Sequence, residues 1–171
     1  ATNSWLHSQT QQSQHRYDRE RGYVCTFSGV VIKSTTAHLF HVGDARIYRL
    51  RGGELTQLTE DHRVWVSSAQ SYLARALGMD RKVEIDYQPI QLAIGDLLIL
   101  ATDGVYEYTD AKFIQSAIRN TADLDSAARA IADEALQRGS GDNLTIQLVR
   151  IDVLPAPEAN EVYRQLSDLP C

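Results

Sequence analysis

A continuous apolar run near the middle of the chain constrains the fold more than any other segment. The stretch GDLLILATDG, residues 95–104, places leucine and isoleucine side chains next to one another and ends in an Asp-Gly pair. A short apolar run bounded by turn residues is typical of a strand that is buried on both faces. The run therefore predicts a buried strand that is followed by a sharp turn.

Other segments have the composition of strands that are exposed on one face. The turn RGGE joins two of them into a predicted hairpin. Pro89 indicates that its strand lies at a sheet edge or contains a bulge, because proline cannot donate a ladder hydrogen bond. The predicted strands cover residues 23–32, 37–42, 45–51, 54–58 and 83–92, and the final stretch LTIQLVRI.

Four segments favour helices. The polar stretch 3–20 predicts a helix with a thin apolar face. Leu73, Ala76 and Leu77 stand at helical spacing, and Gly78 could end that helix. The stretches DAKFIQSAIRNTA and DLDSAARAIADEALQRG each place apolar residues along one face, which predicts two amphipathic helices.

Length, charge and cysteine content exclude several classes of protein. A chain of 171 residues suits one domain, and a net charge of −5 argues against a nucleic-acid partner. The apolar runs fall well short of the ~20 residues that span a bilayer. The two cysteines form no CxxC pair or Cys/His cluster, which fits a reducing, cytoplasmic setting. We therefore expect a cytoplasmic protein with no membrane segment here.

Three aspartates stand beside glycines at the ends of predicted strands. Asp44 lies in HVGDARIYRL between two alternating segments, Asp103 follows the buried run, and Asp142 lies in GSGDNLTIQL before the last strand. A lone aspartate in such a place is usually a turn residue, because its side chain accepts from nearby backbone N–H groups. Three of them at one end of a sheet would form an acidic cluster, whose charges need compensation.

A divalent cation is the natural partner of such a cluster. Mg²⁺ and Mn²⁺ take carboxylate oxygens as ligands, and the sequence offers no run of arginine or lysine near all three aspartates. Two such ions can share a bridging water, lower its pKa and stabilise an in-line displacement at phosphorus. The alternative is a structural β-domain whose turn aspartates have no chemical role.

The order of five stretches resembles a known family. VGDARIYRL, LTEDH, ARALG, GDLLILATDGVYE and GSGDNLTIQLV are similar to motifs of the metal-dependent protein phosphatases of the 2C type, the PPM family, over roughly residues 22–151. The resemblance implies an α+β fold, an αββα four-layer β-sandwich with flanking helices. It also implies a bacterial Mg²⁺/Mn²⁺-dependent serine/threonine protein phosphatase, which hydrolyses phosphoserine and phosphothreonine with metal-activated water.

The same resemblance assigns roles to individual residues. Asp44, Asp103 and Asp142 match aspartates that bind the metal ions, of which the complete domain would hold two or three. The nucleophile would be water, so no side chain is assigned as one. Asn143 would support the ligands without binding the ion, and Arg46 either pairs with Asp44 or has a structural role on its strand.

Two further residues match a family motif. Asp61 and His62 correspond to the DH pair, which we interpret as structural. The segment that follows it, RVWVSSAQSYL, is shorter than the family's flap near the substrate site, and it predicts a minimal flap.

The chain departs from the family at its N-terminal side. The family's first metal motif is an Asp-Gly followed by a Gly-rich turn, and no such stretch precedes Gly43. The N-terminal strands that carry this motif are absent with it. We therefore expect residues 1–151 to form the C-terminal two thirds of a phosphatase 2C-like domain.

The proline-bearing tail, residues 152–171, is expected to be a linker or exit segment. It resembles the linker of bacterial proteins in which such a phosphatase precedes a serine/threonine kinase domain. The expected partners are therefore a phosphoprotein substrate and a fused or cognate kinase in a signalling pathway. Two functions stay open: an active phosphatase, or a catalytically incomplete phosphatase-like module that regulates a fused or partner kinase.

Overall fold

The structure is a computed structural model that describes residues 1–14, 16–17, 22–67 and 70–155. Helices and strands alternate in an irregular order along the chain. In chain order they are α1 (Thr2–Gln12), β1 (Phe27–Lys33), β2 (Thr36–Val42), β3 (Arg46–Arg51), β4 (Glu54–Gln57), β5 (Arg63–Ser67), β6 (Gln70–Leu73), β7 (Asp86–Gln91), β8 (Leu97–Ala101), α2 (Asp103–Tyr106), α3 (Ala111–Asn120), α4 (Leu124–Gln137) and β9 (Ile146–Arg150).

The strands form two antiparallel sheets and a separate hairpin. One sheet has the order β1-β2-β7, the other has the order β4-β3-β8-β9, and β5 pairs with β6. The hairpin predicted around RGGE is confirmed, since Arg51 pairs with Glu54. Pro89 lies on β7, which is an edge strand as predicted. The consecutive strands β2 and β3 lie in different sheets, so the chain crosses between the sheets at Gly43 and Asp44.

The predicted buried strand is confirmed as β8. It lies between β3 and β9, and its two faces belong to two different cores. Leu98 packs between the sheets, whereas Ile99 packs under the helices, and the two are 1% and 0% exposed. A strand with apolar layers on both faces has no solvated face, which explains why its sequence does not alternate.

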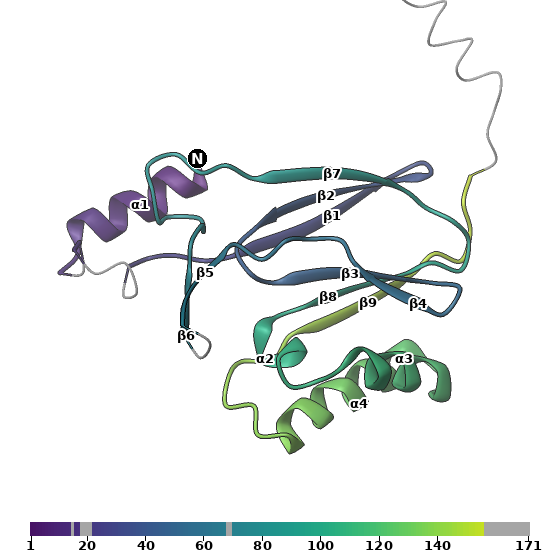
Figure 1. Cartoon of the computed structure of the whole chain (residues 1–171). Helices are drawn as coiled ribbons and strands as arrows, with labels where there is room; N and C mark the ends of the chain where they lie inside the picture. Colours follow the sequence, from purple (N-terminus) through teal and green to yellow (C-terminus); the bar gives the residue numbers. More distant parts are fainter. Residues whose placement is uncertain (15, 18–21, 68–69, 156–171) are drawn as a thin grey trace, which may run out of the picture.

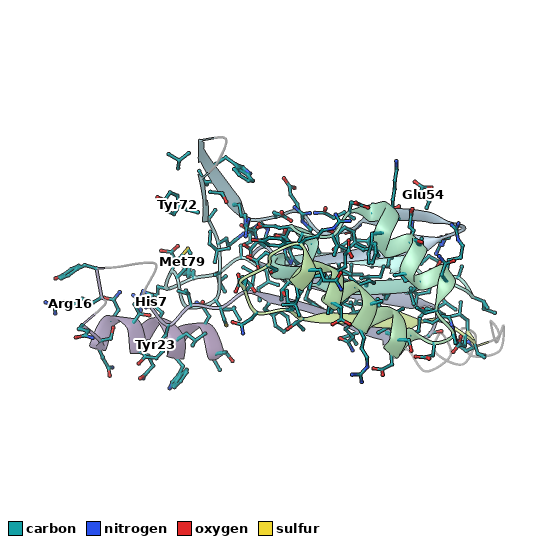
Figure 2. The ribbon with its side chains drawn as sticks, turned by 90° about the horizontal axis from the view of Figure 1, so that it is seen from below. His7, Arg16, Tyr23, Glu54, Tyr72 and Met79 are labelled. Carbon is teal, nitrogen blue, oxygen red and sulfur yellow. The ribbon has the colours of Figure 1, made fainter. Side chains whose placement is uncertain are left out.

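Helices α3 and α4 cover the outer face of the four-stranded sheet (Figure 1). Asp110 and Asp123 cap them, because each carboxylate accepts a backbone N–H of the first turn. Helix α1 lies beyond one end of the strands in both views (Figures 1 and 2). Two packed antiparallel sheets with flanking helices confirm the predicted α+β class.

Some local predictions are wrong. The helix predicted before Gly78 is absent, because Leu73 ends strand β6 and Leu77 forms a β-bridge with Cys25. Short apolar spacing cannot separate a helix from extended chain, and here pairing with distant segments decides. The sharp turn expected after the buried run is the short helix α2, which begins at Asp103.

The two ends of the chain are described only in part. The first helix ends at Gln12 rather than reaching residue 20, and residues 15 and 18–21 of that predicted helix lie outside the described residues. Of the predicted linker, residues 156–171 likewise lie outside the described part. Within the part that is described, none of the helices has the length and apolar character that a bilayer crossing requires.

Candidate metal centre

The first aspartate of the site lies where the chain crosses between the two sheets. Gly43 adopts φ of +113°, and a Cβ built there would lie 2.3 Å from the Thr26 side chain, so the crossover requires glycine. Two hydrogen bonds connect Gly43 to His62: the Gly43 backbone N–H donates to His62 Nδ1 at 2.9 Å, and the His62 backbone N–H donates to the Gly43 carbonyl at 2.8 Å. The crossover thereby sets the position of Asp44.

The other two aspartates come together because β8 and β9 are paired. Asp103 begins α2 just beyond the end of β8, and Asp142 lies in the loop before β9. Gly104 allows the two segments to touch, since a Cβ built there would lie 2.6 Å from the Asn143 carbonyl oxygen and 3.2 Å from Asp142 Cβ. Two segments that are about forty residues apart in sequence therefore meet beside Asp103.

The electrostatics agree with a cluster of three carboxylates. Burial raises the pKa of Asp103, and the negative charges of Asp44 and Asp142 raise it further. The N–H of Gly104 and the charge of Arg63 oppose this rise in pKa only in part. The charges of Asp44 and Asp142 thus lie close enough to Asp103 to disfavour its ionised form.

Arg63, at the start of β5, compensates part of this charge. Its Nε donates to Asp44 Oδ2 at 2.6 Å, its Nη2 donates to Asp103 Oδ2 at 2.9 Å, and its Nη1 donates to Glu107 Oε1. The sequence argument missed Arg63 and Glu107. The sequence places Arg63 directly after the DH pair and Glu107 four residues after Asp103, but neither position by itself indicates a contact with the aspartates.

The predicted pairing of Arg46 with Asp44 is not the one that the structure contains. Arg46 Nε and Nη2 donate to the Asp61 carboxylate, with the closest contact at 2.6 Å, and the guanidinium lies 3.7 Å from the centre of the Tyr106 ring. Tyr106 in turn donates its hydroxyl to the Asp44 carbonyl at 2.9 Å. Arg46 therefore belongs to a structural wall beside the site.

The remaining predicted residues also have clear surroundings. Asn143 supports Asp142 through its backbone, because its N–H donates to Asp142 Oδ1 at 2.7 Å. Burial alone would raise the pKa of Asp86, but the hydrogen bond from His62 Nε2, which lies 2.9 Å from Asp86 Oδ2, lowers it. The contacts of His62 agree with the structural role expected for the DH pair.

A pocket of about 460 Å³ opens beside the carboxylates. It is lined by Arg46, Asp61, Arg63, Trp65, Ser71, Tyr106 and Glu107. A larger cavity of about 540 Å³ lies between β2, β7 and the segment after β4, and its lining contains none of the three aspartates. Neither lining includes any of the three aspartates, but the smaller pocket is lined by Arg63, which contacts Asp44 and Asp103, so it is the one that adjoins the candidate centre.

The donor set has the chemistry that a hard divalent cation requires, since three carboxylates supply oxygen ligands and excess negative charge. In the part of the chain that the structure describes, no group of three histidine, cysteine, aspartate or glutamate side chains is arranged around a common ion position. Instead, the Arg63 guanidinium forms ion pairs with both Asp44 and Asp103, at 2.6 Å and 2.9 Å.

Comparisons with known proteins place this geometry in a family. The sequence profile of the family described as Stage II sporulation protein E (SpoIIE) matches residues 2–152. The serine/threonine phosphatase stp of Listeria monocytogenes is 27% identical over 147 residues, which cover 77% of this chain and 58% of that protein. The chain thus spans little more than half the length of that curated relative.

Two further comparisons concern PstP. The serine/threonine protein phosphatase PstP of Mycobacterium tuberculosis is 30% identical over 139 residues, covering 73% of this chain and 27% of that protein. The crystal structure of the PstP catalytic domain in complex with two manganese ions aligns with a TM-score of 0.72 at 26% identity, covering 88% of this chain and 67% of that one. Because the profile matches most of its length, the chain belongs to the family of SpoIIE/PP2C-type domains.

Proposed function

We propose that this chain carries part of the active site of a Mg²⁺- or Mn²⁺-dependent serine/threonine protein phosphatase, with Asp44, Asp103 and Asp142 as metal ligands. The convergence of these three aspartates from three separate segments beside one another carries the proposal. The manganese ions of the PstP structure support the choice of cation. The substrates are phosphoserine and phosphothreonine residues of proteins.

Each part of the site has a task in this proposal. The bound cation supplies Lewis acidity and positive charge for hydrolysis of a phosphate monoester. Asp103 and Asp142 hold it from the β8–β9 end, and Asp44 holds it from the crossover between the sheets. Asn143 orients Asp142 through its backbone N–H, and Arg46 supports the wall of the adjoining pocket through Asp61 and Tyr106.

The cysteine content and the source of the relatives support a proposal for the biological setting. We propose a signalling protein of the bacterial cytoplasm, since the sequence contains no CxxC pair or Cys/His cluster and the relatives named above are bacterial proteins. A fused or cognate serine/threonine kinase is the proposed partner. A phosphatase that removes the phosphates transferred by such a kinase needs access to the same phosphoproteins.

A second candidate function has its own observation. Arg63 donates to one oxygen each of Asp44 and Asp103, where it competes with a metal ion. A site of this kind could bind metal weakly and lack turnover. The chain would then be a catalytically incomplete module that regulates a fused or partner kinase.

Titration with Mn²⁺ tests the metal site first. We expect Asp103→Asn to weaken Mn²⁺ binding at least about tenfold, because a charged ligand is replaced by a neutral one. Calorimetry measures the binding, and thermal unfolding in chelator checks that the variant folds. Asp152→Asn is the matched control, because Asp152 is exposed and pairs with Arg150 outside the site.

Turnover then separates the two functions. Phosphothreonine peptide hydrolysis that depends on Mn²⁺ and is lost in Asp103→Asn supports the phosphatase. Mn²⁺ binding without hydrolysis supports the incomplete module. If wild type and Asp103→Asn bind Mn²⁺ equally, the assignment of Asp103 as a metal ligand is wrong.

A further inference from the structure

We propose that Arg63 is a built-in counter-cation of the metal carboxylates, which holds Asp44 and Asp103 in the metal-free protein and releases them when a divalent cation binds. The affinity of the site for metal is therefore set by a competition between a side chain of this chain and the ion. This inference rests on the proposed function, because it takes both aspartates as metal ligands.

Arg63 contacts one oxygen of each of two proposed metal ligands. Its Nε and Nη2 donate to Oδ2 of Asp44 and Oδ2 of Asp103, at 2.6 Å and 2.9 Å. The Arg63 side chain is only 15% exposed, so solvent screens these contacts weakly. Arginine cannot be deprotonated in proteins, so the side chain is a permanent cation, and Asp44 and Glu107 accept its hydrogen bonds.

Simultaneous occupancy is electrostatically unfavourable. A divalent cation that binds Asp44 and Asp103 would lie within a few ångströms of the guanidinium, at a distance where like charges repel strongly in a partly buried site. An oxygen that accepts a short charged hydrogen bond also has less electron density to offer a metal. Metal binding is therefore expected to weaken at least one of the two contacts that Arg63 makes with these carboxylates.

The surroundings offer Arg63 a second position. Glu107 already accepts from Nη1, and its side chain is 45% exposed on the pocket side. The pocket of about 460 Å³ beside the carboxylates is lined by Arg63 itself, with Glu107 and Asp61 in its wall. The guanidinium can rotate into this pocket and keep Glu107 as its partner. When Arg63 releases the two aspartates, its guanidinium therefore still has Glu107 as an acceptor.

Calorimetric titration with Mn²⁺ tests the competition on the whole chain, with Arg63→Gln and Arg63→Lys beside wild type. We expect Arg63→Gln to lower the Mn²⁺ dissociation constant about tenfold or more, because metal binding no longer breaks a charge-assisted hydrogen bond. Arg63→Lys keeps the charge and is expected to lie closer to wild type. Arg138→Gln is the matched control, since Arg138 pairs with Glu134 and Asp110 on the surface and loses the same charge.

A second readout does not depend on metal. In chelator, we expect the midpoint of thermal unfolding to fall in Arg63→Gln, since the carboxylates lose their counter-charge, and saturating Mn²⁺ is expected to restore it. The competition is wrong if Arg63→Gln is folded and binds Mn²⁺ no more tightly than wild type. If none of these proteins binds Mn²⁺, the proposed metal site itself is wrong, whereas binding by wild type with no gain in Arg63→Gln overturns only the competition.

Discussion

At the scale of single residues, glycines decide how closely the site segments approach. Gly104 follows Asp103 and packs against the loop that carries Asp142. A Cβ built on Gly104 would lie 2.6 Å from the Asn143 carbonyl oxygen, so the loop comes this close only because residue 104 has no side chain. Gly141 is in the same loop as Asp142, but a Cβ built there meets nothing within 4 Å. Of these two glycines, only Gly104 is needed for the close contact between the start of α2 and the loop that carries Asp142.

Alanine substitutions measure this difference. We expect Gly104→Ala to lower the free energy of unfolding by about 1–3 kcal/mol, the usual cost of forcing extra atoms into a packed position. It is also expected to weaken Mn²⁺ binding, because the loop with Asp142 must move away. Gly141→Ala is the control and is expected to change neither quantity. Chemical denaturation and calorimetry measure the two effects, and equal stabilities of the two variants would contradict the close approach.

At the scale of elements, an ion pair fastens the loop before β8 to β3. Arg51 at the end of β3 donates Nε and Nη2 to the carboxylate of Asp96, both at 2.6 Å. Asp96 is 1% exposed and also accepts the N–H of Ala93 at 2.8 Å. A buried carboxylate with these partners sets where the central strand begins, so its charge state matters for the sheet.

The pH dependence of stability follows from Asp96. The hydrogen bond from Arg51 lowers the pKa of this carboxyl below its unfolded value, even though burial opposes the shift. Its contribution is therefore complete above the unfolded pKa of about 4 and is lost as pH falls through the lower folded pKa. We expect Asp96→Asn to lower the melting temperature at pH 7 and to flatten its decline below pH 4. Thermal unfolding across pH 2–7 measures this, and an unchanged acid limb in the variant would contradict it.

At the scale of the whole molecule, two apolar layers hold the sandwich together. One lies between the sheets and includes Leu39, Ile47 and Leu98. The other lies between the four-stranded sheet and the helices and includes Ile99 and Ile131. Figure 2 shows the β5–β6 hairpin, marked by Tyr72, projecting from the sandwich far from Glu54 at the β3–β4 turn. The site is thus built where the layered body meets a projecting element.

Loss of a side chain between the sheets tests this layering. We expect Leu98→Ala to lower the free energy of unfolding by about 2–5 kcal/mol, because it leaves a cavity in a closed layer. Val31→Ala on β1 is the control: this side chain is 57% exposed, and its loss is expected to cost below about 0.5 kcal/mol. Denaturant unfolding compares the two, and similar costs would contradict a closed layer at Leu98.

The sequence by itself determined the strongly patterned parts of this protein. The run of residues 97–101 predicted the buried strand, and the two apolar helical stripes predicted α3 and α4. The order of the motifs indicated the family and singled out the three aspartates. The strand and helix predictions depend on local patterns, because periodicity and turn residues act within a few positions of one another.

Only the tertiary structure decided what surrounds the aspartates. The pairing of Leu77 with Cys25 overrides a local helical spacing, and the crossover at Gly43 places β2 and β3 in different sheets. By the resemblance, Arg46 was either a partner of Asp44 or a structural residue, and it pairs with Asp61. Arg63 pairs with Asp44 instead, because the segment that enters β5 is hydrogen-bonded to the crossover before β3. Contacts between segments that are distant in sequence depend on how the sheets pack, and no local pattern encodes which charge will meet which carboxylate.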